Sequence, residues 1–107
     1  MELSMETIRS LCAQNKIIWT SHALVRLIQR EISRENVKEA LMKGKIIEQY
    51  PQDYPHPSCL ILALDIAGAA LHVVCGATET NLWIITAYRP NLKDWEDDFM
   101  TRRGGKR

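Results

Sequence analysis

Two apolar runs, residues 58–65 and 69–77, are separated by only three residues and constrain the fold more than any other feature. Both runs are apolar at successive positions, as expected for central strands that are covered on two sides. Gly68 supplies the positive φ that a tight turn between two strands requires. Strands joined by so short a turn pair antiparallel, because parallel neighbours need a longer crossover. The sequence therefore predicts a central antiparallel hairpin.

The length of the turn also fixes the register of this hairpin. With residues 66–68 in a three-residue turn, the numbers of facing residues sum to 134. Cys59 then lies opposite Cys75, and Leu62 lies opposite His72. We therefore predict two reduced thiols with neighbouring Cβ atoms on one face of the sheet. A two-residue turn would shift the pairing and separate them.

Hydrophobic periodicity and capping residues define the other elements. The expected elements are helices over 6–14, 21–30 and 34–43, strands over 16–19, 46–50 and 82–88, and a final helical turn through Trp95 and Phe99. Thr20 and Ser21 offer N-cap hydroxyls for the second helix, and Ser33 caps the third. Gly44 is placed for the left-handed conformation just past the end of the third helix.

Together these elements specify an α+β fold in which successive strands pair antiparallel. We predict one sheet of about four antiparallel strands, with the helices over 21–30 and 34–43 packed on one face. The strands over 46–50 and 58–65 must then belong to the same sheet. Because the 107 residues include no linker, we expect a single domain over 1–107.

Charge and cysteine content limit the class of protein. The net charge is +1, and residues 102–107 contribute four positive charges, so the remainder carries −3. A generally basic surface, typical of non-specific nucleic-acid binding, is therefore absent. We expect the basic tail from about residue 101 to be a frayed, solvated end. Three cysteines without C-x-x-C spacing, no membrane-length apolar run and no signal peptide predict reduced thiols and a cytoplasmic location.

A polar stripe runs along one face of the helix expected over 21–30. His22, Arg26 and Arg30 are spaced four residues apart, and Gln29 lies beside them. Two guanidiniums one helical turn apart are suited to gripping a phosphate, and a histidine in the first turn is a candidate base. The stripe therefore fits a phosphate clamp with a neighbouring base. The alternative is a solvated face whose arginines pair with glutamates elsewhere.

A second candidate site is the end of the last strand, Tyr88-Arg89-Pro90. Proline ends the hydrogen-bond ladder and exposes the residues before it at the edge of the sheet. The phenol of Tyr88 and the guanidinium of Arg89 are suited to act as a proton donor and a transition-state clamp. The alternative is a plain strand end with a partly buried tyrosine.

The three histidines do not indicate a metal centre. His72 lies within an apolar strand, where a hydrogen-bonded core role competes with contact to a substrate, and His56 is expected in an exposed loop between two prolines. Even with Asp53 as a further ligand, these histidines lack the spacing of a helical metal site. The sequence also lacks a glycine-rich phosphate loop, a nucleophile elbow and zinc-ribbon cysteines. We therefore expect neither a metal nor another cofactor.

Several spaced motifs together resemble a known family. They are His22-Ala23…Arg26…Arg30…Ile32-Ser33 with residues 44–48, Leu71-His72-Val73-Val74, and Thr86-Ala87-Tyr88-Arg89-Pro90 with Trp95. Over about residues 19–99 the combination resembles a widespread prokaryotic family of small uncharacterised domains related to the RelE/ParE toxin superfamily. The resemblance implies a RelE-like fold, with two N-terminal helices packed on an antiparallel meander of about four strands.

The resemblance also implies a function. Members of this family are often encoded beside zinc-finger antitoxins, which implies a toxin–antitoxin role with an antitoxin protein as partner. RelE-like toxins cleave messenger RNA without a metal, so RNA is the implied substrate. On this basis His22 is the expected base, Arg26 and Arg30 stabilise the phosphorane, and Tyr88 is the expected acid. The expected substrate-binding residues are Arg89, Gln29 and His72.

The resemblance leaves an alternative function open. ParE-like relatives act on gyrase without cutting RNA, so the scaffold alone does not decide the function. The alternative is a non-catalytic binding module that inhibits a protein target. Clustering of the polar stripe with Tyr88 or Arg89 in one cleft would favour the enzyme, and separation onto different faces would favour the module. For the toxin, we expect an acidic antitoxin segment to dock across the stripe and this strand end.

Overall fold

The computed structural model describes residues 2–105, which form three helices and one five-stranded sheet. The elements are α1 (Met5–Ala13), β1 (Ile17–Trp19), α2 (Ser21–Gln29), α3 (Arg34–Lys43), β2 (Lys45–Tyr50), β3 (Ser58–Leu64), β4 (Ala70–Ala77) and β5 (Leu82–Tyr88). Each matches an element expected from the sequence to within one or two residues. The helical turn expected at Trp95 and Phe99 was wrong, because residues 91–105 form turns and an isolated bridge.

Capping side chains account for the starts of α2 and α3. The Oγ1 atom of Thr20 accepts a hydrogen bond from the backbone N–H of Ala23. Ser33 accepts from the N–H of Asn36, whose side chain in turn accepts from the N–H of Ser33. This reciprocal capping box satisfies two backbone donors that the helix itself leaves free. Both helices therefore begin where the sequence predicted.

The central hairpin has the register that the sequence predicted. Gly68 has a φ of 84° in the β3–β4 turn. Cys59 pairs with Cys75, and Leu62 pairs with His72. The two Sγ atoms are 3.9 Å apart and both thiols are free. The hydrogen bond that the Cys75 thiol shares with Cys59, together with burial, raises the pKa of Cys75 well above its ordinary value.

The sheet has the strand order β1-β5-β4-β3-β2. Strands β2 to β5 pair antiparallel in succession, so the strands expected over 46–50 and 58–65 do share one sheet. Strand β1 adds a fifth member, which pairs parallel with β5 and sets Ile17 beside Leu82. The expectation of about four antiparallel strands is corrected to five strands of mixed direction. No local sequence pattern predicts the pairing of β1 with β5, because these strands lie near opposite ends of the chain.

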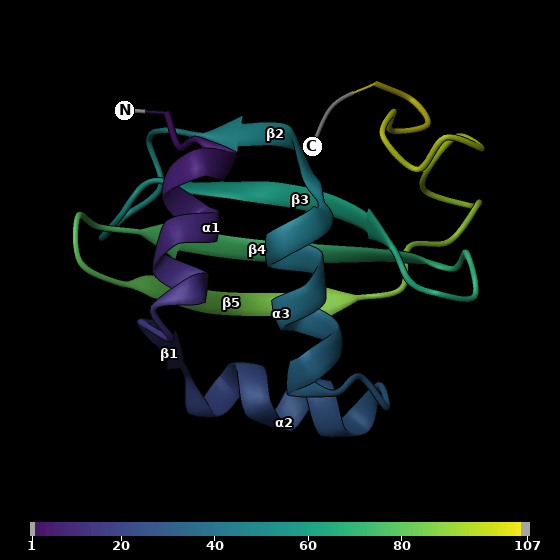
Figure 1. Ribbon diagram of the computed structural model, residues 1–107. Coiled ribbons are helices and arrows are strands. Elements are labelled where there is room, and N and C mark those ends of the chain that lie inside the picture. The colour runs from purple at the N-terminus through teal and green to yellow at the C-terminus, as the bar shows by residue number, and fades with distance from the viewer. Residues whose placement is uncertain (1, 106–107) are drawn as a thin grey trace.

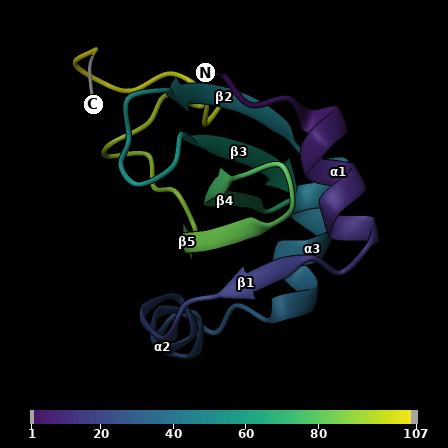
Figure 2. The ribbon, with the colours of Figure 1, turned by 90° about the vertical axis from the view of Figure 1, so that its left-hand side faces the viewer.

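The three helices do not all cover the same face of the sheet (Figure 1). Helices α1 and α3 lie across one face of the sheet, whereas α2 lies along the edge formed by β1 and β5 (Figure 2). The expectation that the helices over 21–30 and 34–43 pack together on one face was therefore wrong for α2. Only a narrow part of α2, including Ala23 and Leu27, is buried, whereas Val25 and Ile28 are 52% and 78% exposed. A helix that buries so narrow a stripe fits against the edge of a sheet, where it contacts few residues, better than across its face.

Helices α1 and α3 cover one face of the sheet, and the C-terminal segment covers the other. On the helix side, the fully buried side chains include Ile8, Val37, Leu41, Ile61, Val73 and Ile84. The opposite face carries Leu60, Leu62 and His72, and the C-terminal segment (residues 90–105) crosses it, as Figure 2 shows. Trp95 of this segment is only 3% exposed and packs against His72. The segment thus forms a third layer over the second face.

Gly44 ends α3 for a different reason from the one expected. Its φ is −79° and its ψ is −177°, so the backbone is extended and the left-handed conformation expected there is wrong. A Cβ atom at this position would lie 2.6 Å from both the carbonyl oxygen of Ala40 and the Cγ2 atom of Ile61. Glycine is required because α3 and β3 approach each other here too closely for any side chain.

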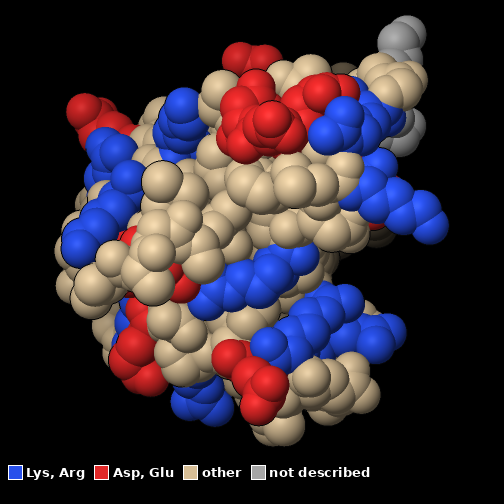
Figure 3. Space-filling model, turned by 90° about the vertical axis from the view of Figure 1, so that its right-hand side faces the viewer, with Lys and Arg blue, Asp and Glu red and all other residues tan. Residues whose placement is uncertain are grey.

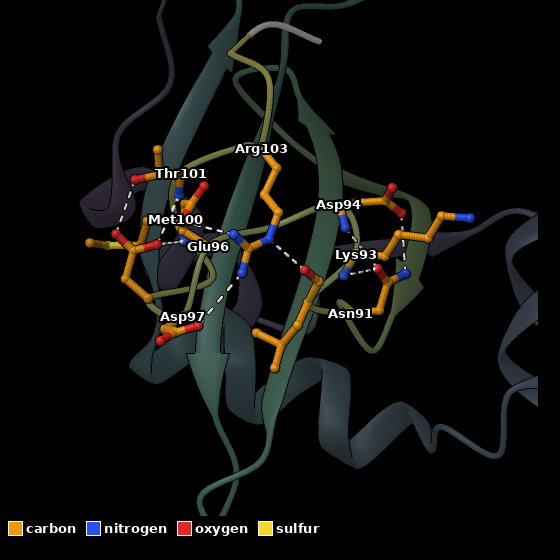
Figure 4. Close-up of polar contacts among 10 residues, drawn as sticks. Asn91, Lys93, Asp94, Glu96, Asp97, Met100, Thr101 and Arg103 are labelled. Atoms are coloured by element: carbon orange, nitrogen blue, oxygen red, sulfur yellow. Dashed lines mark hydrogen bonds and ion pairs between the residues drawn. The ribbon is translucent and has the colours of Figure 1, made fainter.

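The C-terminal segment is held by its own polar contacts (Figure 4). The side chains of Asn91 and Asp98 each accept hydrogen bonds from two backbone N–H groups within the segment. Arg103 forms ion pairs with Glu96 at 3.0 Å and Asp97 at 3.7 Å. These contacts differ from the frayed, solvated end expected from residue 101. Residues 106–107 of the expected tail lie outside the described residues.

Candidate active site

The centre of the candidate site is a hydrogen-bonded pair, Tyr88 and His72. The two residues face each other across β5 and β4, and the Tyr88 Oη atom lies 3.2 Å from Nδ1 of His72. On the other side of the ring, Nε2 lies 2.8 Å from the carbonyl oxygen of Phe99. A carbonyl only accepts, so Nε2 carries the proton of the neutral ring and Nδ1 accepts from the phenol. Tyr88 therefore donates its proton towards a base.

His72 is fully buried, and its surroundings keep it neutral. Burial lowers the pKa of His72 from its ordinary value of 6.5, while the Phe99 carbonyl and the charge of Glu48 act in the opposite direction. The Trp95 ring meets the imidazole edge-on, with ring centroids 4.5 Å apart. The expectation of a hydrogen-bonded core histidine is confirmed. The partly exposed phenol of Tyr88 connects this buried ring to the surface.

A strong ion pair closes one side of the site. Arg102 donates to Glu48 through Nε at 2.8 Å and through Nη2 at 3.0 Å, and its guanidinium lies 4.6 Å from the centre of the Trp95 ring. The hydroxyl of Tyr50 also donates to Glu48. Burial and this hydrogen bond raise the pKa of Tyr50 to about 12, and Glu48 raises the pKa of Arg102. The cluster therefore stays charged and fastens the C-terminal segment to β2.

Arg30 approaches Tyr88 from the other side. Its Nη1 atom donates to Oγ1 of Thr86 at 3.0 Å and to the carbonyl oxygen of Ala87 at 2.9 Å. Within residues 2–105, Arg30 has no ion pair, so its charge is not neutralised by a carboxylate. Burial raises the pKa of Tyr88, while the charges of Arg102 and Arg30 lower it. The phenol therefore remains protonated at neutral pH beside an uncompensated cation.

Tyr88, Trp95 and Arg102 line a polar cleft with a volume of about 390 Å³, and His72 and Arg30 lie behind its wall. Its walls come from the end of β5 and from the C-terminal segment, and the lining residues are Tyr88, Pro90, Asn91, Lys93, Asp94, Trp95, Arg102 and Arg103. Figure 3 looks onto this end of the molecule and shows a surface hollowed between two groups of basic side chains. The cleft thus combines a proton-transfer pair with positive charge.

The structure divides the residues of the predicted polar stripe. Arg30 is bonded to Thr86 and Ala87, next to Tyr88 on β5. Arg26 donates to the side chain of Gln29 at 3.2 Å, and both Arg26 and Gln29 are exposed. His22 is exposed near the start of α2 and has no hydrogen bond or ion pair to another described residue. The eight-residue spacing places His22 about 12 Å along the helix axis from Arg30. One member of the stripe, Arg30, is therefore bonded to β5 directly beside Tyr88.

Arg89 turns away from the cleft. Its Nη1 atom lies 3.1 Å from the carboxylate of Asp65 and 3.2 Å from the carbonyl oxygen of Ala70. Hydrogen bonds from the Ala69 backbone, and then the charge of Arg89, lower the pKa of Asp65. In this arrangement Arg89 holds the β3–β4 turn to the end of β5.

The three histidines lie apart from one another. His72 contacts Tyr88 and Trp95, and His22 is exposed on α2. His56 was expected to be an exposed loop residue, but it is half-buried and its ring stacks on Trp83. In the part of the chain that the structure describes, no group of three or more His, Cys, Asp or Glu side chains is placed to hold a metal ion. The carboxylate of Asp53 instead accepts a hydrogen bond from Ser58.

Sequence reasoning missed two members of the site, Glu48 and Arg102. Arg102 belongs to a cluster of basic residues that is typical of a solvated end, and Glu48 is one charged residue on an edge strand. Their pairing joins segments that are distant in the sequence. The only local signal was Trp95, a large apolar side chain that needs a surface to cover. A segment that brings Trp95 to the sheet also brings Arg102.

Fold and site together define a small α+β domain with a cationic cleft at one end of a mixed sheet. Residues 19–89 match the family described as "Domain of unknown function (DUF4258)". The match covers more than half of the chain, so the protein belongs to the DUF4258 family. Comparisons with curated proteins and with solved structures give no match. No helix among residues 2–105 is long and apolar enough to cross a membrane.

Proposed function

We propose that this chain is a metal-independent endoribonuclease that cleaves messenger RNA at the Tyr88 cleft. The observation that carries the proposal is the hydrogen-bonded pair of Tyr88 and His72 beside the guanidinium of Arg30, which has no carboxylate partner among residues 2–105. RNA cleavage by the neighbouring 2′-hydroxyl requires a base, positive charge near the phosphorane and a proton for the leaving oxygen. Tyr88 and Lys93 line the cleft, and His72 and Arg30 lie next to Tyr88, so the chain's own side chains can supply each of these.

The first proton transfer uses the Tyr88–His72 pair. As the 2′-oxygen attacks the adjacent phosphorus, its proton passes to the Oη atom of Tyr88, and the phenol proton passes to Nδ1 of His72. The Phe99 carbonyl already accepts from Nε2 and so stabilises the imidazolium that forms. In this proposal the base is His72 acting through Tyr88, rather than His22 as the resemblance implied.

Positive charge and a second proton complete the step. Arg30 stabilises the negative charge that develops on the phosphorane oxygens, because no carboxylate in the described chain competes for it. The bond from phosphorus to the 5′-oxygen then breaks, and the leaving oxygen takes a proton from the ammonium of Lys93, which lines the same cleft. The products are a 2′,3′-cyclic phosphate and a 5′-hydroxyl.

A second candidate is supported by the surface of α2. Val25 and Ile28 are exposed large apolar residues that flank Arg26. Exposed apolar side chains next to arginine are typical of protein interfaces. In the toxin proposal this surface receives an acidic antitoxin segment. In the alternative, the same surface binds and inhibits a protein target, and the cleft has no catalytic role.

Cleavage of a labelled RNA by the purified full chain tests the proposal. Tyr88→Phe removes only the phenolic oxygen and is expected to lower the rate at least about 100-fold. Arg30→Ala should also lower it, whereas His22→Ala, the matched control on the same helix, should leave it near wild type. The cyclic phosphate should form in the presence of a chelator. Wild-type rates for Tyr88→Phe would refute the catalytic assignment, and no cleavage with or without ribosomes would favour the binding module.

A further inference from the structure

A pair of stacked rings lies on β5, at the opposite end of the strand from Tyr88. The rings of His56 and Trp83 have centroids 5.6 Å apart and an angle of 30° between their planes. Trp83 belongs to β5, whereas His56 comes from the loop between β2 and β3. Both residues are only half-buried. The pair therefore presents an aromatic surface that the catalytic proposal does not use.

A β-bulge places this pair on the same face of the sheet as the cleft. Trp83 and Tyr88 are five residues apart, so in a regular strand they would point to opposite faces. On β4, however, their partners are Gly76 and His72, which are four residues apart and share a face. The register shift at Ile85 accounts for the extra residue on β5. Trp83 and Tyr88 therefore face the same side, about 13 Å apart along the sheet.

Gly76 permits the loop to seat His56 on Trp83. A Cβ atom at position 76 would lie 3.3 Å from the carbonyl oxygen of Pro57 and 3.8 Å from the Cβ atom of His56. The N–H of Ala77 donates to the same Pro57 carbonyl. The loop between β2 and β3 therefore crosses β4 at Gly76, the one residue of that strand without a side chain. The stacked pair is a built feature of the fold and not a chance contact of exposed rings.

The indole of Trp83 has an unused hydrogen-bond donor. Its Nε1 atom is buried and has no hydrogen-bond partner within the described residues. An unsatisfied buried donor costs free energy, so this ring is not placed by stability alone. A small shift of the ring on binding would bring this N–H to an acceptor on a ligand.

We propose that His56 and Trp83 form a base-stacking subsite for a single-stranded RNA whose scissile phosphate lies at Arg30 and Tyr88. The inference rests on the proposed nuclease function and specifies its substrate as an unpaired strand. Aromatic rings next to a cationic groove bind single strands with little sequence preference, because every base has a flat face to stack. Between the two subsites, Ile85 is 41% exposed and offers an apolar surface along the strand path.

An affinity measurement with a cleavage-resistant RNA tests the subsite. A fluorescent oligonucleotide with 2′-O-methyl groups is titrated with the full chain, and binding is followed by anisotropy. Trp83→Ala should weaken binding about ten-fold or more, and His56→Ala should weaken it less. Trp83→Phe keeps a ring and should retain most of the affinity. Tyr54→Ala removes a ring that is 94% exposed in the same loop and serves as the control.

An abasic scan separates stacking from a general loss of structure. Each nucleotide is replaced in turn by an abasic one, and one position should weaken binding to wild type but not to Trp83→Ala. Equal responses of both proteins at every position, or wild-type affinity of Trp83→Ala, would overturn the subsite. If that happens while Tyr88→Phe still abolishes cleavage, the nuclease proposal stands. If wild type binds no RNA, both proposals fail together.

Discussion

The Nε2 atom of His72 lies 2.8 Å from the carbonyl oxygen of Phe99 and so joins the centre of the sheet to the C-terminal segment. Phe99 has a positive φ of 56°, an uncommon conformation for a bulky residue. The same contact fixes the tautomer of His72 and turns Nδ1 towards Tyr88. The position of the C-terminal segment and the chemistry of the cleft are therefore coupled through one imidazole.

We predict that the folded state loses stability below pH 6.5 because of His72. Burial lowers the pKa of His72 from its ordinary value of 6.5, so the folded chain stays neutral where the unfolded chain takes up a proton. Above pH 6.5 neither state binds this proton and the stabilisation is fully present. As the pH falls from 6.5 towards the folded-state pKa, the free energy of unfolding decreases by up to about 1.4 kcal/mol per pH unit.

Urea unfolding between pH 5 and pH 8 measures this effect. His72→Gln should remove the dependence between pH 5 and 6.5, whereas His22→Ala, which alters an exposed histidine, should retain it. A wild-type free energy of unfolding that is constant from pH 8 to pH 5 would contradict the prediction.

We predict that Glu48→Gln loosens the C-terminal segment. The substitution keeps the shape of the side chain but removes the charge that Arg102 contacts through two hydrogen bonds. Both side chains are less than a quarter exposed, so we expect a loss of about 1–3 kcal/mol in the free energy of unfolding. Trypsin should also cleave after Arg102 faster than in wild type. Glu79→Gln, in the exposed β4–β5 turn, is the control and should change neither quantity.

Two glycines with different roles should respond differently to asparagine. Gly68 has a φ of 84° and open space around its Cα atom, so Gly68→Asn should cost less than about 1 kcal/mol, since Asn tolerates this conformation. Gly44 is extended and has backbone and side-chain atoms within 2.6 Å of any added Cβ atom. Gly44→Asn should therefore cost about 1–3 kcal/mol or prevent folding. Comparable urea midpoints for the two variants would show that the close approach is not what selects Gly44.

The parts of the fold that were predictable are those set by neighbours in the sequence. The pairing of Cys59 with Cys75 follows from a turn of known length. The parallel pairing of β1 with β5 and the edge position of α2 do not, because each depends on segments far apart in the chain. Gly44 shows a related limit, since a glycine after a helix fits both a left-handed cap and a close approach.

The candidate site was predictable only in part, for the same reason. Tyr88 stood out because Pro90 ends its strand, and Arg30 stood out by its spacing on a helix. That Arg30 bonds to β5 beside Tyr88 while His22 has no contact there depends on how α2 lies on the sheet edge. His72 was expected as a hydrogen-bonded core residue or as a substrate contact, but nothing local showed that its partner would be Tyr88.

We predict that partner binding and cleavage can be separated on the surface of α2. Arg26 is exposed and bonded only to Gln29, whereas Arg30 is bonded to β5 beside Tyr88. Arg26→Glu should therefore weaken binding of an acidic antitoxin while leaving cleavage near wild type, because only the docking surface changes sign. Arg30→Glu should reduce both. The double variant should lose both partner binding and toxicity.

Co-purification with the protein encoded beside this chain, and growth arrest on controlled expression, measure the two effects. Lys43→Glu on α3 is the matched control, because it reverses an exposed charge away from the α2 surface. If the double variant co-purifies with its neighbour at wild-type affinity, the antitoxin does not dock on this surface. If Arg26→Glu abolishes cleavage as completely as Arg30→Glu does, then Arg26 also acts in the cleft, and docking and catalysis cannot be separated along α2.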